Sequence, residues 1–159
     1  MELITKSGKR KKLLSCMPED YLGCDPKSFP TEAHLQEACI RYFRSFLKPI
    51  FPDAVLRVNP FSESKSISSI EMERAKRVGF ERSNPDVIIA HTSGMFCGIA
   101  LEIKRVESSD ITKDLKPISE HAKKQQAKLD KLALAGFKSK FSRGLDMFVE
   151  DVSNYFSQT

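Results

Sequence analysis

The sequence predicts one α/β domain in which helices flank a mixed central β-sheet. Its 159 residues suit a single core. An apolar content of 40% is enough for a packed interior, and 30% charged residues is ordinary for a soluble protein. The hydrophobic period switches between helical and strand values, which gives the order α, β, (α), β, β, α, β, α. No apolar run approaches the ~20 residues of a membrane helix.

Residues 1–30 are expected to form a basic, irregular arm, and residues 31–159 to form the folded domain. The arm carries basic residues between Lys6 and Lys12 and several prolines. It lacks the apolar run of a signal peptide, so a cytoplasmic location is expected. The four cysteines show no C-x-x-C pair, which favours buried or idle thiols in a reducing compartment.

The first element is a helix over residues 32–47, which Thr31 can cap and which ends before Pro49. At 100° per residue, Glu32 falls in line with the apolar face. That face is centred on Cys39, Phe43 and Phe46. A carboxylate in this position is unfavourable unless it has a partner, which favours a functional role. The alternative is that Glu32 favours the helix dipole and points into water.

A short strand is expected over residues 54–59, then a polar loop over 60–69 and a short helix over 70–78. Residues 86–91 and 96–104 have the pattern of two strands joined by a tight turn. The short connection predicts an antiparallel hairpin.

A loop over residues 105–118 leads to a long helix over 119–135, a strand over 137–142 and a final helix over 145–156. The apolar stripe of the final helix comprises Leu145, Phe148, Val149, Val152 and Phe156.

The chemistry-bearing residues lie on the predicted hairpin. Strand alternation places Glu102 and Lys104 on the same face, and the hairpin register places Asp86 opposite Leu101 or Glu102. Converging carboxylates need a cation, and oxygen ligands favour Mg²⁺ or Mn²⁺. Such an ion can polarise a phosphodiester and activate water, while Lys104 orients that water or stabilises developing charge. The alternative is an ordinary surface hairpin, because E-x-K alone is common.

The long helix after the hairpin adds a buried amide to this set. Its predicted buried stripe comprises Ala122, Gln125 or Gln126, Leu129, Leu132 and Ala133. A buried glutamine must be hydrogen-bonded, and a water or phosphate of a site would satisfy it. His121 lies one turn earlier on nearly the same side. The alternative is that Gln125 sits at the edge of the stripe.

Basic residues are concentrated in the second half of the chain. The stretch from Lys104 to Arg143 contains eleven Lys and Arg residues but only five Asp and Glu residues. A basic surface suits nucleic acid, although many basic faces are merely solvated.

Several short motifs occur in a fixed order along the chain. They are Glu32-Ala-His-Leu35-Gln36, Lys76-Arg-Val-Gly79, Pro85-Asp86, Glu102-Ile-Lys104, and Gln125 with Leu129, Leu132 and Gly136. In this combination the sequence resembles the VRR-NUC (virus-type replication-repair nuclease) domain of the PD-(D/E)XK superfamily, especially its small stand-alone phage and viral members. The likeness covers about Thr31 to Phe156.

The resemblance implies a restriction-endonuclease-like core and a DNA endonuclease that depends on Mg²⁺ or Mn²⁺. It also implies branched or flapped DNA as substrate, a role in replication, recombination or repair, and a homodimer. The catalytic set it implies is Asp86, Glu102, Lys104, Gln125 and Glu32. The metal ligands expected are Asp86, Glu102, Ile103 and Glu32. The residues expected to contact DNA are Lys76, Arg77, Arg82, Lys124 and His121.

The sequence departs from the family pattern at two places upstream of Asp86. Ser83-Asn84 replaces the usual glycine before the Pro-Asp pair, and Asn59-Pro60 appears where the family has Pro-Asn. Both changes affect the backbone beside the site and leave the catalytic groups intact. Two other functions stay open, namely a nucleic-acid-binding module that has lost cleavage and a small basic protein that binds a partner through its last helix.

Overall fold

The computed structural model describes residues 28–59 and 84–158 throughout, with isolated positions at 16, 17, 19, 25, 73, 74 and 77. The predicted loop over 60–69 and most of the predicted helix over 70–78 therefore lie outside the described residues. Among the helices described, none is long and apolar enough to cross a membrane.

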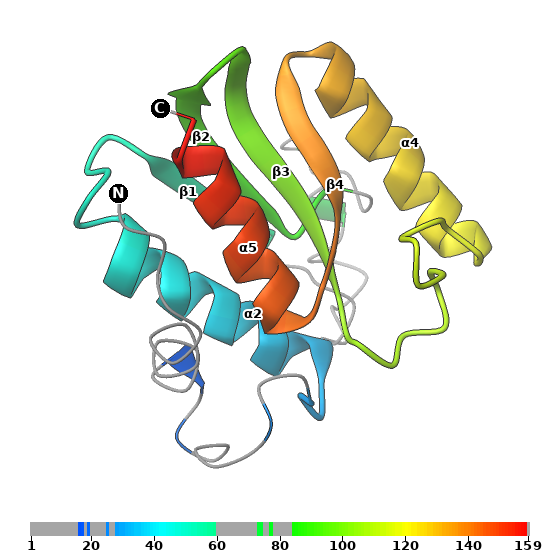
Figure 1. Cartoon of the computed structure of the whole chain (residues 1–159). Helices are drawn as coiled ribbons and strands as arrows, with labels where there is room; N and C mark the ends of the chain where they lie inside the picture. Colours follow the sequence, from blue (N-terminus) through cyan, green and yellow to red (C-terminus); the bar gives the residue numbers. More distant parts are fainter. Residues whose placement is uncertain are drawn as a thin grey trace.

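A four-stranded mixed sheet forms the centre of the fold (Figure 1). Its strands are β1 (Val55–Val58), β2 (Val87–Ser93), β3 (Phe96–Lys104) and β4 (Phe137–Arg143), in the order β1-β2-β3-β4. The pairs β1–β2 and β2–β3 are antiparallel, whereas β4 runs parallel to β3. A parallel neighbour requires a crossover connection, which the helix between β3 and β4 supplies.

The helices lie against both faces of this sheet. They are α2 (Glu32–Tyr42), continued by the π-helix η2 (Phe43–Leu47), then α4 (Glu120–Leu134) and α5 (Gly144–Phe156). In Figure 1, α2 and α5 lie together over one face, and α4 lies alongside β4. The predicted α/β class, with a mixed sheet flanked by helices, is confirmed. The predicted ends of the described helices and strands are right to within two residues.

The larger core lies between the sheet and the α2–α5 pair. The predicted stripe of α5 is buried, as are Ile99, Leu101 and Ile103 on the same face of β3. A hydrogen bond of 3.2 Å between the hydroxyls of Tyr42 and Ser153 joins α2 to α5.

This core also draws on residues that precede position 31, where the folded domain was predicted to begin. Cys16, Met17 and Phe29 are each at most 2% exposed and belong to the same cluster of buried residues. Prolines and charges around these three residues hide any regular period, so the sequence does not predict their burial.

A smaller core lies on the opposite face, beneath α4. It comprises Ile111, Ala122, Leu129 and Phe141. The buried stripe of α4 is narrower than predicted, because Leu132 is only half-buried and Ala133 is exposed. The helix rests mainly on β4 at the edge of the sheet, so one narrow row of side chains fills the contact. Gln125, which belongs to this row, is buried as predicted.

Gly98 lies in a closely packed part of β3. A Cβ atom added there would lie 2.5 Å from the Cε1 atom of Phe137 and 2.7 Å from the backbone oxygen of Ile89. The phenyl ring could turn aside, but the carbonyl of a central strand cannot move without disturbing the ladder.

We therefore expect Gly98→Ala to lower the free energy of unfolding by about 1–3 kcal/mol, the usual effect of overpacking. Urea denaturation measures the change. The matched control is Thr92→Ala on the exposed side of β2, which should change stability by at most about 0.5 kcal/mol. Equal stability of the Gly98 variant and the native protein would contradict this account of β3.

Candidate active site

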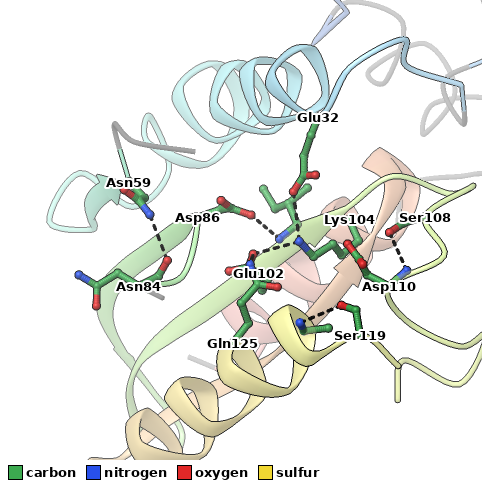
Figure 2. Close-up of polar contacts among 12 residues, drawn as sticks. Glu32, Asn59, Asn84, Asp86, Glu102, Lys104, Ser108, Asp110, Ser119 and Gln125 are labelled. Atoms are coloured by element: carbon green, nitrogen blue, oxygen red, sulfur yellow. Dashed lines mark hydrogen bonds and ion pairs between the residues drawn. The ribbon is translucent and has the colours of Figure 1, made fainter. Parts of the chain in front are cut away.

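Five polar side chains from four separate segments meet at one end of the sheet (Figure 2). Glu32 comes from the first turn of α2, Asp86 immediately precedes β2, Glu102 and Lys104 end β3, and Gln125 lies in α4. The ladder pairs Val87 with Leu101, so the next pair along it sets Asp86 opposite Glu102. The structure therefore brings together all five residues that the sequence assigned to catalysis.

Three of these residues form a compact group of carboxylates. One oxygen each from Glu32, Asp86 and Glu102 lies within 4.8 Å of the others. Asp86 and Glu102 are only 4% and 2% exposed, whereas the Glu32 side chain is 32% exposed. Glu32 therefore marks the open side of the cluster.

Lys104 is the cation of the cluster. Its side chain is 1% exposed, and its Nζ lies 3.3 Å from Oε1 of Glu102 and 3.4 Å from Oε1 of Glu32. Burial by itself lowers the pKa of this ammonium group, but the carboxylates of Glu102, Glu32 and Asp86 outweigh that effect and raise it. Lys104 thus stays charged and joins α2 to β3.

Asp86 is fixed by the backbone of the neighbouring strand. The N–H of Ile103 donates to its Oδ2 at 2.9 Å. Burial, followed by the negative charge of Glu32, raises the pKa of Asp86 to about 7, and the Ile103 and Lys104 groups offset only part of this. In the absence of a further cation, Asp86 therefore keeps its proton to an unusually high pH.

Glu102 is held from the side of α4. The amide Nε2 of Gln125 donates to its Oε1 (Figure 2), while Oε1 of Gln125 is buried with no partner among the described residues. Burial and then the charge of Asp86 raise the pKa of Glu102 well above its usual value. Gln125 therefore contacts a site carboxylate, so it does not merely border the apolar stripe.

Asn59 is a residue of the site that sequence reasoning passed over. Its backbone N–H donates to the carbonyl of Asp86 at 2.9 Å, and its side-chain Nδ2 donates to the carbonyl of Asn84 at 3.1 Å (Figure 2). These two bonds tie the end of β1 to the backbone that precedes β2. The departures from the family pattern at Asn59 and Asn84 thus lie in one contact, and the only sequence signal for it was that both positions depart from that pattern.

Arg143 was also missed. It pairs with Lys104 across the β3–β4 ladder, and its guanidinium donates to the carbonyls of Ile111 and Thr112 at 2.6 and 2.9 Å. Arg143 therefore anchors the loop between β3 and α4 beside the cluster. Nothing in the sequence distinguishes it from other basic residues, because its partners are backbone oxygens far along the chain.

The structure describes three of the five residues expected to contact nucleic acid. Lys124 is exposed next to Gln125, and His121 is half-buried one turn earlier. Arg77 is exposed and lies 3.8 Å from Glu73. Lys76 and Arg82 lie outside the described residues.

The donor set fits a divalent cation of the Mg²⁺ or Mn²⁺ type. Three carboxylates face one ammonium group, so the ionised cluster carries a net charge of two negative units. Carboxylate oxygens are the ligands that these hard ions prefer. Burial, and then the negative charge of Glu32, raise the pKa of Asp86 to about 7, so a bound cation would favour its ionised form.

Comparisons with known proteins give a distant likeness among solved structures. No family model matches the sequence, and no curated protein matches it. Among solved structures, a chain described as a "VRR_NUC domain protein" is 20% identical, with a TM-score of 0.47 over 65% of this chain and 69% of that chain. A likeness this distant says nothing about chemistry, so the function has to come from the residues of the site.

The raised pKa of Asp86 predicts how the stability of the metal-free protein depends on pH. Between pH 4 and its folded pKa of about 7, folded Asp86 keeps a proton that the unfolded chain has lost. Asp86 therefore makes stability fall with rising pH in this window, by up to about 1.4 kcal/mol per pH unit. We expect Asp86→Asn to remove this component and to be more stable than the native protein at pH 8.

Urea denaturation of metal-free protein from pH 4 to pH 8 measures this difference. Asp53→Asn, at an exposed position, serves as the matched control and should follow the native profile. Parallel profiles for Asp86→Asn and the native protein would show that Asp86 is not protonated in the folded state.

Proposed function

We propose that this protein is a metal-dependent nuclease that hydrolyses phosphodiester bonds of DNA. The observation that carries the proposal is the cluster of Glu32, Asp86 and Glu102 around the buried Lys104. The order of motifs in the sequence supports it, because the same residues that resemble the PD-(D/E)XK pattern supply the cluster.

The carboxylates of Glu32, Asp86 and Glu102 would hold Mg²⁺ or Mn²⁺, and we add the backbone carbonyl of Ile103 as a further ligand. When bound, such an ion polarises a phosphodiester and lowers the pKa of an attacking water.

The residues of the chain have separate tasks in this proposal. Lys104 keeps a positive charge at the site, where it stabilises the negative charge that develops on the phosphate. Gln125 fixes the orientation of Glu102 through its amide N–H. The greater exposure of Glu32 indicates that the substrate approaches near the start of α2.

We further propose that residues 31–159 form a restriction-endonuclease-like domain of VRR-NUC type, similar to its small phage and viral members. In this proposal the protein acts in the cytoplasm on junction or flap DNA during replication, recombination or repair, as a homodimer that offers one site to each of two strands. His121 and Lys124 on α4, with Lys76, Arg77 and Arg82, would contact the phosphate backbone.

Cleavage is tested with labelled linear, flap and four-way-junction DNA, in Mn²⁺, in Mg²⁺ or in EDTA. We expect cleavage only with the metals, and a loss of at least about 100-fold in Asp86→Ala and Lys104→Ala, because each removes a group that acts in the transition state. The matched controls are Asp53→Ala and Lys113→Ala at exposed positions. Undiminished metal-dependent cleavage by both site variants would contradict the assignment of Asp86 and Lys104 to the active site. DNA binding without cleavage in any metal would favour a nucleic-acid-binding module that has lost cleavage.

A substitution of Lys124 tests whether bound DNA contacts α4. We expect Lys124→Ala to weaken DNA binding at low salt and to reduce the slope of log affinity against log salt by about 1, the effect of losing one phosphate contact. Fluorescence anisotropy at several salt concentrations measures both quantities. Arg44→Ala, at an exposed position of η2, is the control, and an equal loss in both variants would remove Lys124 from the interface.

A further inference from the structure

Gln36, one turn after Glu32 on α2, is a buried amide whose hydrogen-bond donor lacks an acceptor. The residue is 5% exposed, and its Nε2 finds no partner among the described residues. Buried amides in proteins are nearly always hydrogen-bonded. The amide N–H group of Gln36 is therefore available to a further acceptor.

The phase of α2 places Gln36 on the same face of the helix as two residues that interact with Asp86. At 100° per residue, Glu32, Gln36 and Cys39 lie within about 60° of one another around the helix. Both residues that flank Gln36 interact with Asp86. Glu32 shares the carboxylate cluster with it, and the pKa of the Cys39 thiol is raised first by burial and then by the charge of Asp86.

Asp86 also has hydrogen-bonding capacity to spare. Its Oδ2 accepts one bond from the backbone N–H of Ile103, whereas an ionised carboxylate offers about four acceptor positions. Carboxylates that bind a metal ion are commonly oriented by hydrogen bonds from a neighbouring group, and loss of that group weakens metal binding. Among the described residues of α2, Gln36 is placed to supply such a bond.

We infer that Gln36 is a positioning residue for Asp86. Its Nε2 donates to the Asp86 carboxylate when the cluster holds a divalent cation, and this bond fixes the carboxylate in the orientation that binds the ion. The inference rests on the metal site proposed above and names the residue that tunes its affinity. In this role Gln36 touches neither the substrate nor the reacting atoms.

The experiment is Mn²⁺ titration by calorimetry of the full chain and its Gln36→Leu variant, with urea denaturation of both metal-free proteins. Leucine has a similar volume and removes both polar atoms. We expect Mn²⁺ affinity to fall by about tenfold or more, while the urea midpoint of the metal-free variant is no lower than that of the native protein. The urea midpoint of the metal-free variant should not fall, because the substitution removes no amide hydrogen bond within the metal-free protein. Gln36→Met, which is unbranched and more adaptable, provides the same measurements if the leucine variant folds poorly.

Two further variants separate this inference from the proposed function. Gln126→Leu removes an amide of α4 that is bonded to Asp130 at 2.7 Å and should leave Mn²⁺ affinity unchanged. Glu102→Gln removes a ligand and should abolish tight binding. Native affinity in the Gln36 variants together with a loss in Glu102→Gln overturns the role of Gln36 alone, and so does a lower urea midpoint with native affinity. Equal affinity in all the variants overturns the metal site as well.

Discussion

The buried ammonium group of Lys104 is the interaction on which the site depends. It lies between the carboxylates of Glu102 and Glu32, which belong to different elements. Two nearly buried carboxyl groups, Asp86 and Glu102, could not both stay ionised in an apolar interior without a cation, because desolvation and mutual repulsion both disfavour their ionised forms. One lysine offsets only part of that charge. The remainder makes the cluster a good receptor for a divalent ion.

The antiparallel pairing of β2 and β3 gives the cluster its geometry. A one-residue shift in this register would turn Glu102 to the opposite face of the sheet. The register is fixed by Val87, Ile89, Ile99 and Leu101, which all pack into the larger core. The same apolar residues that stabilise the fold therefore also align Asp86 with Glu102. The stability of the fold and the geometry of the site therefore both depend on the register of β2 against β3.

The groups around the carboxylates come from all sides of the fold. Gln125 reaches Glu102 from α4, Asn59 ties the backbone of Asp86 to β1, and Arg143 anchors the loop beside Lys104. Gln36 completes this arrangement from α2. Each of these contacts joins segments that are far apart in the sequence, so the orientation of the carboxylates depends on the whole domain. Rigid support of this kind is what a site that positions a metal ion requires.

The sequence by itself determined the elements and the central residues. Helical and strand periods located α2, β3, α4 and α5 closely, because each has a strong apolar face. The E-x-K spacing and the hairpin turn predicted that Asp86 lies opposite Leu101 or Glu102, since strand alternation and short turns obey local rules. The helical phase of Glu32 and Gln125 marked both as polar groups facing the core.

Only the tertiary structure decided which groups those residues meet. The contacts of Asn59 and Arg143 are with backbone carbonyls, and a carbonyl acceptor leaves no mark on the side chains of a sequence. The burial of Cys16 and Met17 depends on packing that no local period reveals. The unpaired amide of Gln36 could be recognised only once its surroundings were known, because hydrogen-bond satisfaction is a property of the folded environment and not of the residue.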